Sequence, residues 1–244
     1  MSEHPLPATV QPTVAAQPPG VYASTMAGAI ALIAWVSLGA QTDITFHRML
    51  WNGFDTFEAI VRITAYLTNL TALLVALCFT CVALRVRAWP GRLLSGPAAV
   101  SAVTVYIVFV GITYNVLLRR LWTPHGYHAV LSESLHTVLP VMCAAYWLLF
   151  VPKFTLSARE RLAWFVYPLA YLVVTFWRGS ETDFYPYPFI DVGRLGYPHV
   201  IVNTTLLMGA FIVLMLVFMT INAWRRPAVV AVGESAGPDL RHPD

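Results

Sequence analysis

Six long apolar stretches decide what this chain of 244 residues can fold into. Each is long enough for an α-helix to cross the hydrocarbon core of a bilayer, although the fifth is short. They cover residues 22–41, 60–84, 97–118, 130–151, 162–177 and 198–222. The composition agrees, since 58% of the residues are hydrophobic, 11% are charged and the mean hydropathy is +0.65. We therefore expect an all-α, polytopic membrane protein, a compact bundle of six transmembrane helices over residues 21–224.

The two ends of the chain are expected to be disordered cytoplasmic tails. Residues 1–20 and 225–244 are rich in Pro, Ala, Gln or Gly and lack a hydrophobic period. No Lys or Arg precedes the first apolar stretch, so the N-terminus does not resemble a cleaved signal peptide. The three cysteines, Cys78, Cys81 and Cys143, lie in apolar stretches, which predicts small buried hydrophobes rather than metal ligands or disulfides.

The distribution of Lys and Arg predicts the orientation in the membrane. If six helices alternate in direction, nine of the 15 basic residues fall on the side of the two termini and six on the other. Loops rich in Lys and Arg stay in the cytoplasm, so both termini are expected there, in a plasma or inner cell membrane. The net charge of +3 is spread over these loops and indicates no nucleic-acid partner.

A histidine inside the fourth stretch is the first candidate for chemistry. His136 lies roughly 9 Å past the start of that stretch, where an imidazole without a partner is costly. Pro140 lacks an N–H, so the carbonyl of His136 loses its helical donor and a kink is expected. Thr68, in the second stretch, lies within about 3 Å of the same depth because both helices run inward. Alternatively, His136 only bonds to a neighbouring helix and Thr68 to a carbonyl of its own helix.

Further polar side chains gather in the same outer half of the predicted bundle, above an apolar inner half. Together with one residue of the last outer loop, Asp191, they are candidates for binding the substrate or an oxyanion. The other four are Asn115, Arg119, Arg178 and Asn203. The alternatives are amides that join helices and arginines that extend to the outer interface. Glu133, one turn before His136, either orients the imidazole or is a solvated carboxylate.

The last outer loop contains an unusual run, Tyr185-Pro186-Tyr187-Pro188-Phe189. Alternating Tyr and Pro favours a stiff, extended segment with aromatic rings at the membrane interface. Two interpretations stay open. The loop is a lid over the polar layer, with Asp191 paired to an arginine, or it only anchors the sixth helix.

Several motifs resemble the bacterial Pr6Pr family of six-span membrane proteins, which is similar to the eukaryotic androgen-induced membrane proteins. The resemblance covers about residues 62–203. Its motifs are Gly111-Ile112-Thr113-Tyr114-Asn115-Val116-Leu117-Leu118-Arg119, Leu135-His136 with Pro140, Phe150-Val151-Pro152-Lys153, Tyr167-Pro168 with Tyr171 and Arg178-Gly179, and Tyr185-Pro186-Tyr187-Pro188-Phe189 with Leu195-Gly196-Tyr197 and Asn203.

This resemblance implies an activity. The androgen-induced relatives hydrolyse fatty-acid esters of hydroxy fatty acids within the membrane, with a threonine nucleophile and a histidine. By motif these are Thr68 and His136 here, the same two residues that the depth argument selects. The family pattern has Gln-Ser-Asn after the threonine, whereas this chain has Asn69-Leu70-Thr71, so the amide moves to another face of the helix.

The sequence therefore predicts an intramembrane threonine hydrolase of lipid (fatty-acid) esters, with no cofactor or metal and with membrane lipid as its partner. A non-catalytic lipid-binding scaffold is the main alternative. A transporter is less favoured because no pair of short, broken helices repeats between the two halves. A haem protein lacks two axial ligands inside the helices, and Lys153 lies outside them, which excludes a retinal Schiff base.

Overall fold

A computed structural model describes residues 20–121 and 124–225, and within these ranges the chain is helical and contains no strand. Five helices are long and apolar enough to cross a membrane, or six if the bent pair α2 (Thr56–Ala65) and α3 (Leu67–Ala83) forms one span. The five are α1 (Val21–Trp51), Pro97–Leu118, Tyr127–Phe150, α8 (Ala158–Thr182) and α9 (Val192–Trp224). The predicted all-α, multi-pass architecture is confirmed. The predicted tails lie outside the described residues, apart from Gly20 and Arg225 at their edges.

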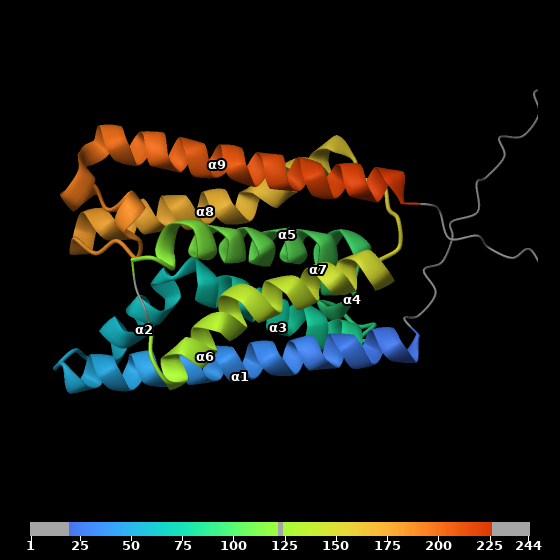
Figure 1. Cartoon of the computed structure of the whole chain (residues 1–244), viewed down its shortest axis with the longest axis horizontal. Helices are drawn as coiled ribbons and strands as arrows, with labels where there is room; N and C mark the ends of the chain where they lie inside the picture. The colour runs from blue at the N-terminus through green and yellow to red at the C-terminus, as the bar shows by residue number, and fades with distance from the viewer. Residues whose placement is uncertain (1–19, 122–123, 226–244) are drawn as a thin grey trace, which may run out of the picture.

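The helices pack as a bundle in which α5 (Pro97–Thr113) is central (Figure 1). It contacts α3, α7 (Leu139–Phe150) and α9, while α1 packs against α3 and α7. The short helix α4 (Gly91–Leu94) joins α3 to α5. The start of α1 and the end of α9 lie at the same end of the bundle (Figure 1).

Small residues allow α1 and α3 to pack closely. On α1 the buried face carries Ala23, Ala27 and Ala31 at intervals of four residues, and on α3 it carries Ala72 and Ala76. Small side chains bring two backbones near each other, which is how helices gain contact energy in lipid. Cys78 and Cys143 are buried in the same core, as expected for small hydrophobes, and Cys81 is partly exposed.

The second apolar stretch differs from a continuous helix. The chain bends by 80° between α2 and α3 at Tyr66, which has an extended backbone (φ −87°, ψ 123°). Helix α2 begins with its own capping box, formed by Asp55 and Glu58. At the bend the Asn69 amide donates to the carbonyl of Ile63 over 2.9 Å. This side chain satisfies a carbonyl that the interruption deprives of its helical partner.

The fourth stretch contains a π-helical turn, η2 (Ser134–Val138), between α6 (Tyr127–Glu133) and α7. A second π-helical turn, η1 (Tyr114–Leu118), continues α5. Pro140 lies just after η2, and the carbonyl of His136 accepts from the Asn115 amide over 3.1 Å. The lost helical bond is thus replaced by a side chain of the neighbouring helix, with a widened turn at the place where a kink was expected.

Gly111 allows this close approach between α5 and the η2–α7 segment. A Cβ atom at Gly111 would lie 2.7 Å from Cγ of Pro140 and 2.8 Å from the backbone oxygen of His136. Such distances are shorter than van der Waals contact, so a larger residue forces the helices apart.

Gly111→Ala is therefore expected to destabilise the bundle by about 1–3 kcal/mol, the usual range for overpacking. Thermal melting in detergent measures the loss. Gly209→Ala in α9 is the matched control, because a Cβ there meets nothing within 4 Å and alanine favours a helix. Equal melting of Gly111→Ala and the wild type would contradict the close packing at this point.

Candidate functional site

Thr68 and His136 come together in the structure, as the sequence predicted. The Thr68 hydroxyl oxygen lies 3.3 Å from Nε2 of His136. Thr68 is the second residue of α3, directly after the bend, and is 8% exposed. His136 lies in the middle of η2. Thr68 therefore lies at the helix break, and His136 lies in the π-helical turn.

The contact of the other ring nitrogen, Nδ1, indicates which nitrogen of His136 carries the hydrogen. Nδ1 lies 2.9 Å from the backbone oxygen of Ser132, one turn earlier. A carbonyl oxygen only accepts, so the hydrogen of a neutral imidazole sits on Nδ1 and the lone pair on Nε2. That lone pair faces the Thr68 hydroxyl, which can donate to it. The pair thus has the tautomer that a general base needs.

Tyr114 holds the imidazole from its face. The two rings stack with centroids 3.8 Å apart and an angle of 14° between their planes. The Tyr114 hydroxyl accepts from the Ser132 hydroxyl over 2.6 Å, and Tyr114 and Ser132 are both buried. The ring of His136 is consequently fixed in position by its stacking partner and by the Ser132 carbonyl.

The N-terminal end of α3 presents backbone donors beside Thr68. The N–H groups of Asn69 and Leu70 bond to the carbonyl of Tyr66, whereas those of Leu67 and Thr68 precede the first helical bonds. The Tyr187 hydroxyl interacts with the amides of Leu67 and Thr68 and with the Thr68 side chain. Burial raises the pKa of Tyr187.

The contacts of His136 involve both ring nitrogens. The Thr68 hydroxyl donates to Nε2, and Nδ1 donates to the carbonyl of Ser132. The imidazole is therefore bonded on both sides, and the Tyr187 hydroxyl lies beside Thr68.

Aromatic contacts hold the Tyr-Pro-Tyr-Pro-Phe loop over Thr68. The Arg62 guanidinium lies 3.5 Å from the ring centre of Phe184, and the Tyr66 ring contacts Phe184 and Tyr187 edge-on. Gly179 lets Tyr185 pack on α8, since a Cβ at Gly179 would lie 2.2 Å from the Tyr185 ring. The aromatic rings of the loop thus lie over Thr68, as in the lid interpretation, but the arginine pair expected for Asp191 is absent from the described residues.

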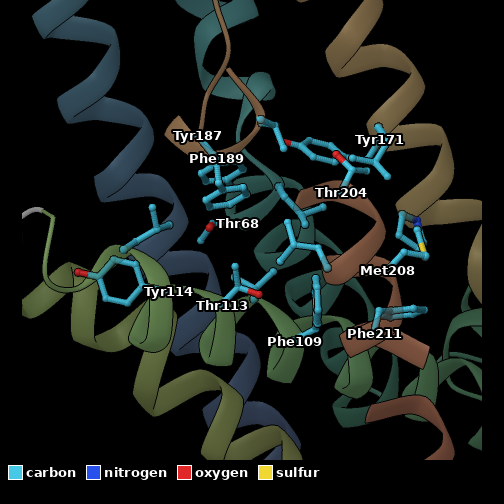
Figure 2. Close-up of a pocket in the computed structure, with 17 residues that line it drawn as sticks. Thr68, Phe109, Thr113, Tyr114, Tyr171, Tyr187, Phe189, Thr204, Met208 and Phe211 are labelled. Carbon is cyan, nitrogen blue, oxygen red and sulfur yellow. The ribbon is translucent and has the colours of Figure 1, made fainter. Parts of the chain in front are cut away.

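An apolar cavity of about 70 Å³, partly open to the surroundings, adjoins Thr68. Its walls come from α3, α5, η1, α8, the loop and α9, and Figure 2 shows Thr68 near the rings of Tyr187 and Phe189. Most of the lining is aromatic or aliphatic. Besides Thr68, it comprises Leu67, Phe109, Val110, Thr113, Tyr114, Leu118, Pro168, Tyr171, Leu172, Tyr187, Phe189, Ile190, Thr204, Leu207, Met208 and Phe211. This surface matches an acyl chain much better than a polar solute.

The five residues predicted to bind substrate or an oxyanion serve other contacts here, and the described lining of the cavity includes none of them. Asn115 and Asn203 donate to the backbone oxygens of His136 and Phe189. Arg119 pairs with Glu133, and Arg178 donates to the carbonyl of Val61 over 3.0 Å. Asp191 does not pair with an arginine among the described residues, but caps α9 by accepting from the Arg194 amide.

The open alternative for Glu133 is decided by contacts. Glu133 does not orient His136; it pairs with Arg119 and accepts from the Thr137 hydroxyl over 2.8 Å. Thr71, one turn after Thr68 on the same helix, is fully buried and bonds to the Tyr167 hydroxyl over 2.8 Å. Thr68 is therefore the threonine that has both a histidine and a cavity beside it.

Sequence reasoning missed Tyr114, Ser132, Tyr187 and the α3 amides as parts of the site. Tyr114 and Tyr187 lie in motifs that the sequence singled out, but nothing in the pattern indicates a ring stacked on His136. The α3 amides are free of helical hydrogen bonds only because of the bend at Tyr66. No Pro or Gly stands at this bend, so the sequence does not predict it.

Comparisons with known proteins add nothing to this geometry: no family model, no curated protein and no solved structure matches the chain.

Proposed function

We propose that the protein is an intramembrane hydrolase of lipid (fatty-acid) esters, with Thr68 as the nucleophile and His136 as the general base. The observation that carries the proposal is the 3.3 Å contact between the Thr68 hydroxyl and Nε2 of His136, with the hydrogen of the imidazole on the opposite nitrogen. The resemblance to the androgen-induced family implies the same two residues, and supports the proposal independently of the depth argument.

The reaction proceeds in two halves. His136 takes the Thr68 proton while the threonine oxygen attacks the ester carbonyl, because an unassisted alcohol is a weak nucleophile. The tetrahedral intermediate collapses, the leaving alkoxide takes the proton from His136, and an acyl group remains on Thr68. A water molecule, deprotonated by the same imidazole, then attacks this ester and releases the fatty acid and the free threonine.

The developing oxyanion fits the N-terminus of α3. The amides of Leu67 and Thr68 are its first two N–H groups, and the positive end of the helix dipole reinforces them. The Tyr187 hydroxyl interacts with these amides and so occupies the place of a substrate carbonyl oxygen. Substrate binding replaces Tyr187 at this place, while the apolar cavity takes the acyl chain.

The rival proposal is a non-catalytic lipid-binding scaffold. It is favoured by the closed state of the site, since Thr68 is 8% exposed and lies under Tyr187. Such a protein would use the cavity for lipid and the Thr68–His136 bond only to join α3 to η2. A transporter is less favoured because the lining is almost entirely apolar.

Activity separates the hydrolase from the scaffold. Purified protein is expected to release fatty acid from a fatty-acid ester of a hydroxy fatty acid. Thr68→Ala should abolish release, and His136→Ala should lower the rate by about 10² or more, which is roughly 3 kcal/mol in the barrier. The readout is liberated fatty acid by mass spectrometry.

Thr71→Ala is the matched control, because Thr71 is a buried threonine of the same helix that bonds to Tyr167 instead of a histidine. It should keep most of the rate. All variants must stay monodisperse with unchanged melting. Wild-type protein that binds the ester in its cavity but releases nothing would decide for the scaffold.

Tyr187→Phe tests the proposed oxyanion position. The substitution keeps the ring contacts but removes the hydroxyl that covers the α3 amides, so the KM should fall by a few-fold with little change in kcat. Tyr185→Phe, in the same loop, should leave both constants unchanged. A tenfold loss of kcat in Tyr187→Phe would instead mean that the tyrosine itself stabilises the transition state.

The orientation remains part of the proposal. We infer that the end of the bundle with both termini faces the cytoplasm and that the site opens to the outer half of a plasma or inner membrane, because clustered arginines retain loops inside. A reporter fused after Asp244 should be active only in the cytoplasm, and one inserted after Glu181 only outside. Activity of the C-terminal reporter on the outer side would reverse this assignment.

A further inference from the structure

A second cavity lies at the opposite end of the bundle from Thr68, where α3 and α7 end and α5 begins. Its volume is about 340 Å³, and it is open to the surroundings. Three arginines of the segment between α3 and α5 line it, namely Arg85, Arg87 and Arg92. Its deeper wall is formed by apolar and aromatic side chains such as Val100 and Tyr146.

The charge of this end of the bundle is strongly positive. Among the described residues it carries seven cationic side chains and one carboxylate, Glu160, which accepts from Ser157 in the capping box of α8. The seven are Arg85, Arg87, Arg92, Lys153, Arg159, Arg161 and Arg225. Within the described residues no carboxylate forms an ion pair with Arg87 or Arg92. An anion is therefore the missing complement of the cavity.

The arginine segment is folded tightly. Arg85 adopts a left-handed backbone (φ 54°) at the end of α3, and the amide of Val86 returns to the carbonyl of Cys81 over 2.9 Å. Gly91 lies against Val86, because a Cβ there would be 2.4 Å from its side chain. Nε of Arg85 donates to the Ser24 hydroxyl on α1. These contacts fix the backbone from which the arginines extend, which lowers the entropy lost on binding.

Apolar side chains of the same segment indicate where the anion comes from. Leu84, Trp89 and Leu93 are 72%, 84% and 66% exposed and alternate with the arginines. Large apolar groups next to Arg, with Trp among them, are typical of the membrane–water interface. At that depth the abundant anions are the phosphate groups of lipids rather than ions dissolved in water.

We propose that this cavity binds the headgroup phosphate of an anionic glycerophospholipid. Arg87 and Arg92 bind the phosphate oxygens, since a guanidinium presents paired N–H groups that match this geometry. The acyl chains of the lipid lie beside Leu93 and Trp89 on the outside of the bundle. The site is separate from the Thr68–His136 pair and does not depend on the proposed hydrolase activity.

Native mass spectrometry of the delipidated full chain tests this site with three probes: dioleoylphosphatidylglycerol, dioleoylphosphatidylcholine and inorganic phosphate. Wild-type protein should prefer the anionic lipid. Arg87→Gln/Arg92→Gln should weaken binding of the anionic lipid by about 30-fold, because each arginine at the interface is expected to strengthen it about 5-fold. Binding of the zwitterionic lipid should not change. The single variant Arg92→Gln, about 5-fold weaker, serves if the double variant is not monodisperse.

Arg159→Gln/Arg161→Gln is the matched control, because these arginines lie at the same end on α8 and are absent from the described lining of the cavity. It should change the binding of the anionic lipid by less than about 3-fold. If both double variants lose the same affinity for the anionic lipid, the lipid binds to a diffuse basic surface and not to this cavity, which overturns the proposal. Equal binding of the two lipids, or displacement of the anionic lipid by millimolar phosphate, would also overturn the proposal.

Discussion

A backbone carbonyl that loses its helical partner inside a membrane must find another donor within the protein, because lipid offers none. This requirement organises the half of the bundle that contains Thr68 and His136. Around the bend at Tyr66, the carbonyls of Val61, Ile63 and Ala65 accept from Arg178, Asn69 and Tyr171. At the π-helical turn the carbonyl of His136 accepts from Asn115. The two interruptions persist because neighbouring side chains satisfy the groups that they free.

The interruptions are also what makes chemistry feasible at this place. In a straight second helix the amides of Leu67 and Thr68 would form helical hydrogen bonds, whereas after the bend they lie at the start of α3 beside the Tyr187 hydroxyl. The π-helical turn carries His136, with Ser132 one turn earlier and Tyr114 on its face. Local departures from the α-helix therefore supply the nucleophile, the base and the oxyanion donors of the proposed reaction.

Much of this could be predicted from the sequence, and the reasons for the rest are physical. Apolar length predicted the membrane helices, and the shared depth of Thr68 and His136 predicted their contact. The roles of Asn115 and Arg178 could not be predicted, since a polar residue inside a membrane serves substrates and backbone carbonyls equally well. The bend at Tyr66 contains no Pro or Gly, so the sequence does not predict it. The sequence therefore does not show which carbonyls lose their helical partner and need these side-chain donors. The stacking of Tyr114 likewise depends on tertiary packing.

Covalent labelling of Thr68 tests the central claim most directly. Full-length protein in detergent is treated with a lipid-like phosphonate fluoride, digested and mapped by mass spectrometry. A nucleophile–base pair predicts one adduct on the peptide that contains Thr68, absent in Thr68→Ala, strongly slowed in His136→Ala and retained in Thr71→Ala. An unlabelled wild-type protein whose cavity binds lipid, or an adduct on another residue that survives Thr68→Ala, would contradict the account.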